Sequence, residues 1–283
     1  MGRDIEEFII LHLLIINQLK MKKLTCITSL ILSSLLINAQ DWSSVYRQVD
    51  EVTLNEGLEE DYDKFESFWK ILKQKHLKEG KILGWFVWKA DKSSNNNNAW
   101  TDYIILNIYE NEQKMKEMNS KTQEWWMNEL KSAHKGKTKR SVVKKYIKET
   151  LDNKYKKKIV SYTNKGIEAY LSEQAAPKAG IVANYIGVEQ LNEDYVDFET
   201  KLFLPYHKSG NTRLYWELNE IVDRTDNAYK PVTHIIFEIR NPESNNIESN
   251  LSFAEEMAVK YGMASRKFHG NLEAELVDFA FGN

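Results

Sequence analysis

The histidines are the residues of this sequence best suited to proton transfer, because imidazole changes charge near neutral pH. His207 follows Pro205 and Tyr206 directly after an apolar helical stripe, a position that places the ring near a helix end. One hypothesis is that His207 acts as a catalytic base. The other is that it is an exposed or helix-capping residue, since the matching position of a similar earlier segment carries no histidine.

Metal and thiol chemistry find no support in the residue spacing. Of the 6 histidines, all but His12 follow residue 40, without the His-x-x-x-His or carboxylate pattern of metal sites. Cys26 is the single cysteine and lies in the amino-terminal apolar segment, so the rest of the chain has no thiol nucleophile and no disulfide. Glycine-rich phosphate loops are absent from the sequence too. We therefore expect no protein-bound metal.

Aromatic side chains far outnumber catalytic types, with 8 Trp, 14 Tyr and 11 Phe. Large rings lining a gap between a sheet and its helices would bind an apolar or aromatic small molecule, with a few polar groups setting its orientation. The alternative is that they are core residues, as large aromatics at helix and strand spacing usually are. The candidates form one group in each half of the chain: Trp69, Trp85, Trp88 and Tyr103, then Tyr206, Tyr215, Trp216 and His234.

An internal repeat indicates which elements position these residues. Residues 58–66 read LEEDYDKFE and residues 191–199 read LNEDYVDFE, which are identical at 6 of 9 positions. Apolar residues recur at three- and four-residue intervals in both copies, so the spacing predicts a helix over about 58–77 and a counterpart over 191–202. The acidic residues at each helix start suit the positive end of the helix dipole.

Strand-like runs flank both helices in the same order, which predicts a βαββαβ sequence of elements. The runs cover residues 45–54, 82–89 and 103–108, and in the second copy residues 181–188, 214–222 and 234–239. A helix over 253–260 and a strand over 272–281 close the second copy. We expect a signal peptide over 1–39, a first module over 40–175 with a basic helical insert, and a second module over 176–283.

The closing section of the first copy, residues 112–170, is helical in pattern and strongly basic. Between residues 114 and 165 there are 16 Lys or Arg against 5 Asp or Glu. Packed helices with solvated lysine sides are one interpretation, and attraction to nucleic acid or an anionic membrane is the other. An exported location argues against nucleic acid. Residues 159–162 or 167–171 could form the last strand of this module.

The first 40 residues have the order of parts of a signal peptide. Lys22 and Lys23 precede an uncharged run over residues 24–37, and Ala39 suits the position before a peptidase cut, so we expect cleavage before Gln40. Met21 would then be the start, with residues 1–20 as an upstream extension. The competing interpretation pairs the apolar runs 8–16 and 24–37 in a membrane-bound hairpin. No stable membrane span is expected after cleavage.

The βαββαβ order, with an aromatic strand after Gly84-Trp85, resembles the dimeric α+β barrel superfamily, which includes NIPSNAP-type proteins and antibiotic-biosynthesis-type monooxygenases. The run Lys78-Glu79-Gly80-Lys81 is similar to a Lys-x-Gly-Lys pattern in tandem-module exported proteins of Bacteroidetes-type bacteria. The resemblance implies an α+β fold in which two ferredoxin-like modules pair their antiparallel sheets into one intrachain barrel. It speaks to fold more than to function, because one fold hosts many chemistries.

The leading hypothesis is an exported protein, periplasmic or secreted, that binds an apolar or aromatic small molecule and needs no cofactor. The resemblance adds a rival, a cofactor-poor monooxygenase or haem-degrading enzyme with His207 as its base, and it leaves haem as the one cofactor to consider. A third hypothesis is a structural module that pairs through its sheets. We expect a monomer or a homodimer with no nucleic-acid partner.

Overall fold

The structure is a computed structural model that describes residues 41–93, 95, 99–173, 175–244 and 251–282. The predicted signal peptide lies outside the described residues. Residues 42–283 form one compact unit. Within the described ranges, no helix is long and apolar enough to span a membrane.

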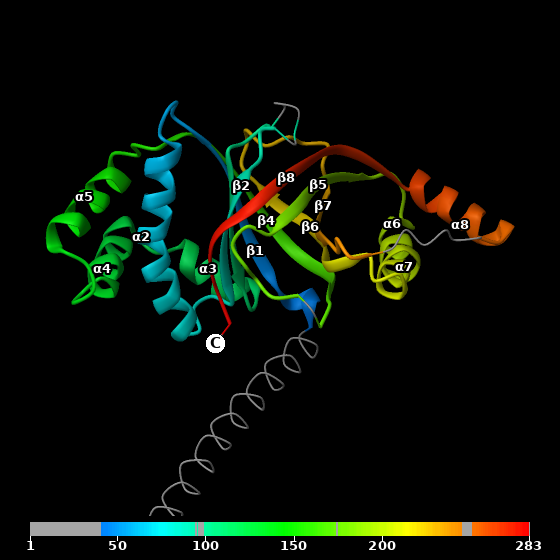
Figure 1. The fold of residues 1–283 in the computed structure, drawn as a ribbon, viewed down its shortest axis with the longest axis horizontal. Coiled ribbons are helices and arrows are strands. Elements are labelled where there is room, and N and C mark those ends of the chain that lie inside the picture. Colours follow the sequence, from blue (N-terminus) through cyan, green and yellow to red (C-terminus); the bar gives the residue numbers. More distant parts are fainter. Residues whose placement is uncertain (1–40, 94, 96–98, 174, 245–250, 283) are drawn as a thin grey trace, which may run out of the picture. The chain divides into compact units, whose positions relative to one another are not determined.

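Eight antiparallel strands close into a barrel in the order β1-β3-β2-β8-β5-β7-β6-β4 (Figure 1). This confirms the predicted α+β fold with a closed antiparallel barrel. The order of the first half, β4-β1-β3-β2, matches that of the second half, β8-β5-β7-β6, and the pairs β2–β8 and β4–β6 join the halves. The strands are β1 (Tyr46–Leu54), β2 (Gly84–Ala90), β3 (Tyr103–Tyr109), β4 (Lys156–Leu171), β5 (Val182–Gln190), β6 (Arg213–Arg224), β7 (His234–Arg240) and β8 (Arg266–Phe281).

Alternation along each strand separates the barrel interior from its helix-covered outer face. On β1, Val49 belongs to the cluster inside the barrel, whereas Val52 and Leu54 belong to the cluster under the helices. Successive side chains of a strand point to opposite faces, so one strand serves both cores. Each strand of the first half therefore borders two separate interiors.

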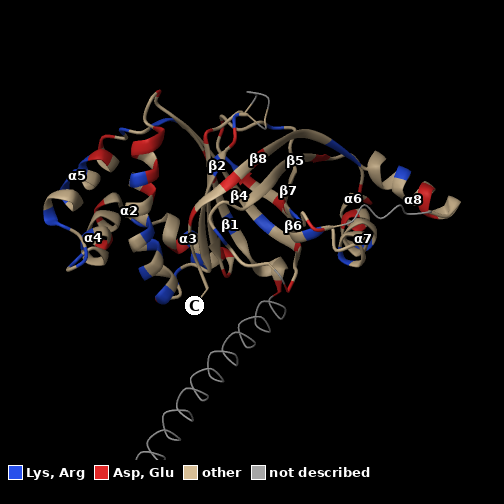
Figure 2. Cartoon of the chain, viewed as in Figure 1, with Lys and Arg blue, Asp and Glu red and all other residues tan. Residues whose placement is uncertain are grey.

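The helices of the first half are α2 (Glu59–Lys78), α3 (Glu112–Asn119), α4 (Gln123–Ala133) and α5 (Arg140–Leu151). The predicted helix over 58–77 is confirmed as α2, and the basic section forms α3, α4 and α5 followed by β4. Val143 is the one buried residue of α5, and the lysines of that helix are exposed. Figure 2 marks the basic residues of the chain in blue. Asn111 and Thr122 cap α3 and α4 by accepting backbone N–H groups.

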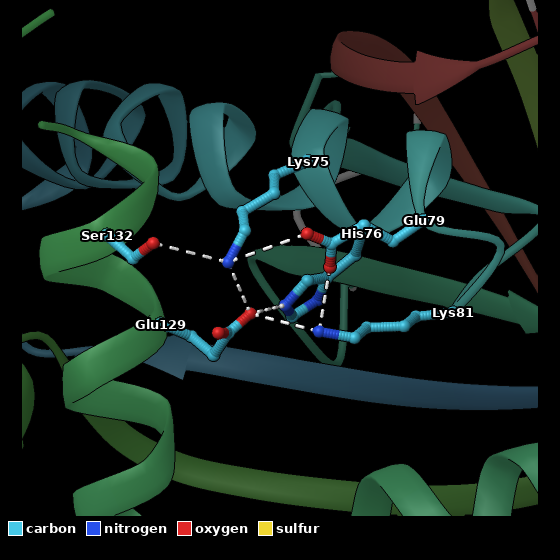
Figure 3. Close-up of polar contacts among 6 residues, drawn as sticks. All are labelled: Lys75, His76, Glu79, Lys81, Glu129 and Ser132. Atoms are coloured by element: carbon cyan, nitrogen blue, oxygen red, sulfur yellow. Dashed lines mark hydrogen bonds and ion pairs between the residues drawn. The ribbon is translucent and has the colours of Figure 1, made fainter.

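One carboxylate ties α4 to the carboxyl-terminal end of α2 (Figure 3). Glu129 accepts hydrogen bonds from Lys75 at 2.8 Å, His76 at 3.1 Å and Lys81 at 3.1 Å. Burial alone would raise the pKa of Glu129, but these three bonds outweigh it and lower the pKa to about 2. Glu129 is therefore ionised at neutral pH and holds the two helices together.

The helix at the second repeat motif starts later in the sequence than the spacing predicted. Residues 191–194 precede the helix, which runs as α6 (Tyr195–Asp197), a π-helical segment (Phe198–Phe203) and α7 (Leu204–Ser209). The predicted start at residue 191 is therefore wrong, whereas the helical course through 202 is confirmed. After α7 the left-handed residue is Asn211, with φ 47, and not Gly210, with φ −83.

The last helix is α8 (Phe253–Ala264). Ser252 and Glu255 form a capping box at its amino-terminal end. Helix α8 contains the predicted helix 253–260. The final strand β8 starts at Arg266, earlier than the predicted residue 272, and β4 is one strand that covers both alternatives for the end of the first module. Both strands are long because each one pairs with a strand of the other half.

Candidate ligand-binding site

A cavity of about 220 Å³ lies between α2 and the outer face of the first-half sheet. Helix α2 forms one wall and strands β1, β2 and β3 form the other, while α5 and the start of β4 border it. The polar and aromatic residues central to its chemistry are Asp50, Glu66, Trp69, Lys73, Trp85 and Asn107.

The apolar stripe of α2 carries two charged side chains into this cavity. Tyr62, Glu66, Trp69, Lys73 and His76 follow one another at spacings of four, three, four and three residues, so they share one helix face. All but Trp69 are buried, and Trp69 is partly buried. The stripe of aromatic residues was visible in the sequence, and the charged positions within it were the signal that could have revealed a site.

Lys73 places an ammonium group in the cavity without a carboxylate in direct contact. The residue is 9% exposed, and its Nζ donates to Asn107 Oδ1 at 2.7 Å. The same nitrogen lies 6.0 Å from the ring centre of Trp69 and 5.4 Å from that of Trp126. Among the residues that the structure describes, it forms no ion pair. Burial lowers the pKa of Lys73 to about 8, so the group is mostly protonated at pH 7.

The carboxyl groups around the cavity either have partners or shift toward their neutral form. Asp50 accepts from the Ser161 hydroxyl at 2.6 Å, and Glu149 accepts from Lys154 at 2.8 Å. Glu66 is buried, and burial raises its pKa. The inner part of the cavity therefore combines aromatic rings, the Lys73 cation, and the Glu66 and Asp50 carboxyl groups, which attract Lys73 without forming an ion pair with it.

Two of the four aromatic residues predicted for the first half line this cavity, namely Trp69 and Trp85. Trp88 points to the other side of β2 and packs inside the barrel, with its ring 4.9 Å from that of Phe237. Tyr103 is fully buried in the core under the helices, where its hydroxyl donates to Asp63 at 2.7 Å.

The candidates of the second half are spread over two faces of the sheet. Tyr215 faces the barrel interior and donates to Glu217, whereas Trp216 is buried on the opposite face of β6. His234 packs against Tyr195 with ring centres 5.0 Å apart. None of them lines the 220 Å³ cavity.

Tyr206 and His207 lie on α7, also away from that cavity. His207 Nδ1 is 3.2 Å from Thr212 Oγ1, and burial lowers the pKa of His207 to about 4. The ring is therefore neutral at pH 7. A catalytic role for His207 stays a prediction.

Comparison with solved structures finds the same barrel architecture. A putative monooxygenase from Lactobacillus acidophilus matches with a TM-score of 0.52 and 13% identity, over 84% of this chain and 96% of that one. A putative monooxygenase from Fusobacterium nucleatum gives 0.49 and 12%, over 85% and 96%. A haem-binding protein from Thermus thermophilus gives 0.38 and 10%, over 83% and 92%.

At this identity the Lactobacillus likeness supports the α+β barrel fold and no activity. No protein-family model matches the chain, and no curated protein matches its sequence.

The residues around the cavity do not fit a haem. In the described part of the chain no histidine lines it, and the Nε2 atoms of the buried His76 and His134 contact Glu129 and the Phe68 carbonyl. The volume of about 220 Å³ is also below the roughly 300–1,000 Å³ of ordinary ligand pockets. No group of three or more potential metal ligands occurs in the described ranges.

Proposed function

We propose that this protein binds a small aromatic acid, either a carboxylate or a phenolate, in the cavity between α2 and the sheet. The observation that carries the proposal is the buried Lys73 ammonium, which has an amide oxygen but no carboxylate as its partner. A buried charge without a contacting counter-ion is costly, and an anionic ligand would supply that contact. The parts of the Trp69 and Trp85 side chains that line the cavity would contact the ring.

The size of the cavity favours one substituted ring. An apolar cavity of about 150 Å³ holds benzene, so 220 Å³ suits a single ring with its acidic group. The ligand's charged end would reach Lys73 and Asn107, which are already joined at 2.7 Å. Glu66 lines the same cavity, and burial raises its pKa, which reduces its repulsion of an anion.

The test is a fluorescence titration with benzoate at pH 7, since Trp69 and Trp85 line the cavity. We expect saturable quenching, and we expect Lys73→Met to weaken benzoate binding at least tenfold, because a hydrogen-bonded charge pair is worth more than about 1.4 kcal/mol. Lys64→Met is the matched control, since Lys64 lies on the same helix and is exposed.

The control variant should bind benzoate as the unaltered protein does. Equal affinity in Lys73→Met, or quenching that persists when Trp69 is replaced by Phe and Trp85 by Tyr, would remove the proposed site. Benzyl alcohol, which has the ring but no charge, should bind at least tenfold more weakly than benzoate.

A second candidate function is the oxidation of a bound catechol by O2, in which two electrons and two protons pass to O2 and give a quinone and hydrogen peroxide. The buried Lys73 Nζ beside Asn107, with a pKa of about 8, is the observation that favours it. A lysine with this pKa is partly neutral at pH 8 and can accept a proton from the catechol, which leaves an electron-rich phenolate. The fold is compatible with such chemistry, since one similar structure is a putative monooxygenase. Oxygen uptake with a catechol, abolished in Lys73→Met, would support it; bound catechol without uptake would leave ligand binding alone.

Two further proposals concern the organisation of the chain. The repeated strand order supports two ferredoxin-like modules, divided near residue 175, that arose as copies of one unit. The leader pattern around Lys22, Lys23 and Ala39 supports export to the periplasm or the exterior. Amino-terminal sequencing of the mature protein tests export, and a start at Gln40 is the expected result.

A further inference from the structure

A second and larger cavity, of about 520 Å³, opens at one end of the barrel. It lies on the inner side of the sheet, whereas the cavity of Lys73 lies on the outer side. Strands β1, β4, β5, β7 and β8 contribute to it, together with the loops that follow β2 and β6. The residues that matter for its chemistry are Glu51, Trp100, Tyr162, Tyr185, Tyr229 and His269.

Four aromatic rings surround this cavity at two depths. Tyr162 and Tyr185 are buried, whereas Trp100 and Tyr229 are 42% and 55% exposed and stand at the rim. The rings of Trp100 and Tyr185 are 6.4 Å apart. A Cβ atom at Gly270 would lie 3.1 Å from the Trp100 ring, so glycine at this position lets the indole lie against β8.

Glu51 brings a carboxyl group to the wall of the same cavity. It is 8% exposed, and one of its oxygens accepts a hydrogen bond from Trp100 Nε1 at 3.0 Å. Among the described residues it forms no ion pair, in contrast to Glu217 elsewhere in the barrel, which pairs with Arg47 at 2.7 Å. The hydroxyl of Tyr185 is also buried and lies close enough to Glu51 to interact with its carboxyl group. The wall thus presents an acid without a contacting cation next to a phenol hydroxyl.

We infer that the barrel cavity binds a small organic cation, an amine or an alkylammonium, with Glu51 as its counter-ion and the four rings as its cage. Aromatic faces attract cations through their negative quadrupole, and desolvated contacts of this kind are the strong ones. A buried carboxylate next to them supplies full charge complementarity. This inference is independent of the proposed function, since it concerns the other face of the sheet and a ligand of opposite charge.

The other charged groups around the cavity leave Glu51 as the anion to be neutralised. Lys158, on β4, is exposed and lies at the cavity wall, where water screens its attraction to Glu51. His269 is already engaged, with Nε2 at 2.6 Å from Glu189 and Nδ1 at 3.1 Å from the Tyr229 hydroxyl. Neither residue forms an ion pair with the Glu51 carboxylate.

Cation binding to Glu51 must depend on pH. Burial raises the pKa of Glu51 to about 7, and only the ionised carboxylate attracts a cation. The affinity should therefore be close to its maximum at pH 8 and should fall about tenfold for each pH unit below 7. Binding of a cation should in turn release a proton from Glu51 near pH 7.

The experiment is a calorimetric titration of the whole protein with benzylamine, benzyltrimethylammonium and benzyl alcohol at pH 8 and pH 6. At least one of the two cations should bind at pH 8, should bind about tenfold more weakly at pH 6, and should exceed benzyl alcohol by at least tenfold. If benzylamine alone binds, the ligand is an amine that donates to Glu51; if benzyltrimethylammonium alone binds, it is a fully alkylated cation. Equal binding of benzyl alcohol, or no binding of either cation, overturns the inference.

Variants separate this site from the rest of the molecule. Glu51→Gln should lower the affinity for the cation at least tenfold and abolish its pH dependence, and Trp100→Leu should weaken binding without removing that dependence. Glu56→Gln, a surface change beyond the end of β1, should leave binding unchanged. Lys73→Met should leave it unchanged too, so failure here and failure of the benzoate site are distinguishable. Unaltered cation affinity in Glu51→Gln would refute the assignment.

Discussion

At the scale of single residues, two buried charged groups without an ion pair among the described residues, Lys73 and Glu51, stand out on opposite faces of one sheet. Asp50 and Glu51 are neighbours on β1, and the first borders the cavity of Lys73 while the second borders the barrel cavity. Strand alternation is the reason that adjacent residues serve different sites. Each buried charge lowers stability unless a ligand compensates it, and such groups cluster at functional sites.

Replacing Glu51 by Gln should raise stability in a pH-dependent manner. The pKa of Glu51 is about 7 in the folded protein and about 4.3 in an unfolded chain. Folding therefore favours the protonated form, and that contribution is complete below about pH 4.3 and is lost as the pH rises through 7. The difference corresponds to roughly 4 kcal/mol. Urea unfolding should show Glu51→Gln more stable by up to this amount at pH 8.5 and equal at pH 4.

A stability gain of the same size at both pH values would contradict this account, because it would show that folding does not change the pKa of Glu51. The comparison needs no ligand. Glu56→Gln should change stability by less than about 0.5 kcal/mol at either pH, as surface substitutions usually do.

Sequence reasoning found the aromatic residues and missed the charged ones. Trp69 and Trp85 were predicted as ligand contacts and do line a cavity, whereas Trp88 and Tyr103 had equally suitable spacing and lie in packed cores. Residue spacing shows which face of a helix or strand a side chain lies on, but not whether that face borders a cavity or a packed core. Lys73 and Glu51 were overlooked because a charged residue within an apolar stripe is evident only after it is known which face of the helix or strand each residue occupies.

At the scale of elements, Glu129 is the main polar link between α4 and α2 (Figure 3). Helices α4 and α5 also share a small apolar cluster with α2, built around Phe68, Leu72 and Leu130. The polar link and the apolar cluster together position α5, which borders the cavity of Lys73.

Glu129→Gln should loosen α4 and α5 from α2. The loss of charge-assisted hydrogen bonds should cost about 1–3 kcal/mol in the free energy of unfolding at pH 7. The contribution of the carboxylate is complete above about pH 4.3 and is lost as the pH falls through the lowered pKa of about 2. Hydrogen exchange should accelerate in α4 and α5 before it does in the barrel strands.

Glu124→Gln is the control, since Glu124 lies on the same helix and is exposed. Equal effects of the two substitutions would show that the contacts of Glu129 add nothing beyond its charge. Unchanged exchange in α4 would show that the apolar cluster alone holds the helix.

Element positions were predicted best where apolar spacing was regular. The stripe of α2 gave that helix within one residue at each end. The second copy contains a π-helical segment at Phe198–Phe203, and its helix starts four residues later than the motif suggested. Strand β4 starts with three consecutive lysines, Lys156 to Lys158, which read as part of a basic helix; pairing with β1 and β6 overrides that local signal.

At the scale of the whole molecule, the internal repeat was the strongest signal. Two copies with the same order of elements implied two sheets of the same order, and two four-stranded sheets joined at both edges give a barrel without free edges. The repeat could not predict the cavities. Both cavities depend on residues that differ between the halves. Lys73, for example, aligns with Tyr206 in the second copy.

A closed barrel with helices outside creates two kinds of cavity on one set of strands. The outer cavity combines a cation with aromatic rings, and the barrel cavity combines an acid with aromatic rings. Ligands of opposite charge should therefore discriminate between them, and the pH dependences of the two affinities should run in opposite directions.

The most direct test of the central claim is the dissociation constant of benzoate measured by calorimetry between pH 7 and pH 10. Lys73 must be protonated to attract the anion, and burial lowers the pKa of Lys73 to about 8. The account predicts that the affinity changes little from pH 7 to 8 and then falls about tenfold per pH unit, and that Lys73→Met removes this dependence. Benzoate affinity that is constant up to pH 10, or unaffected by Lys73→Met, would contradict it.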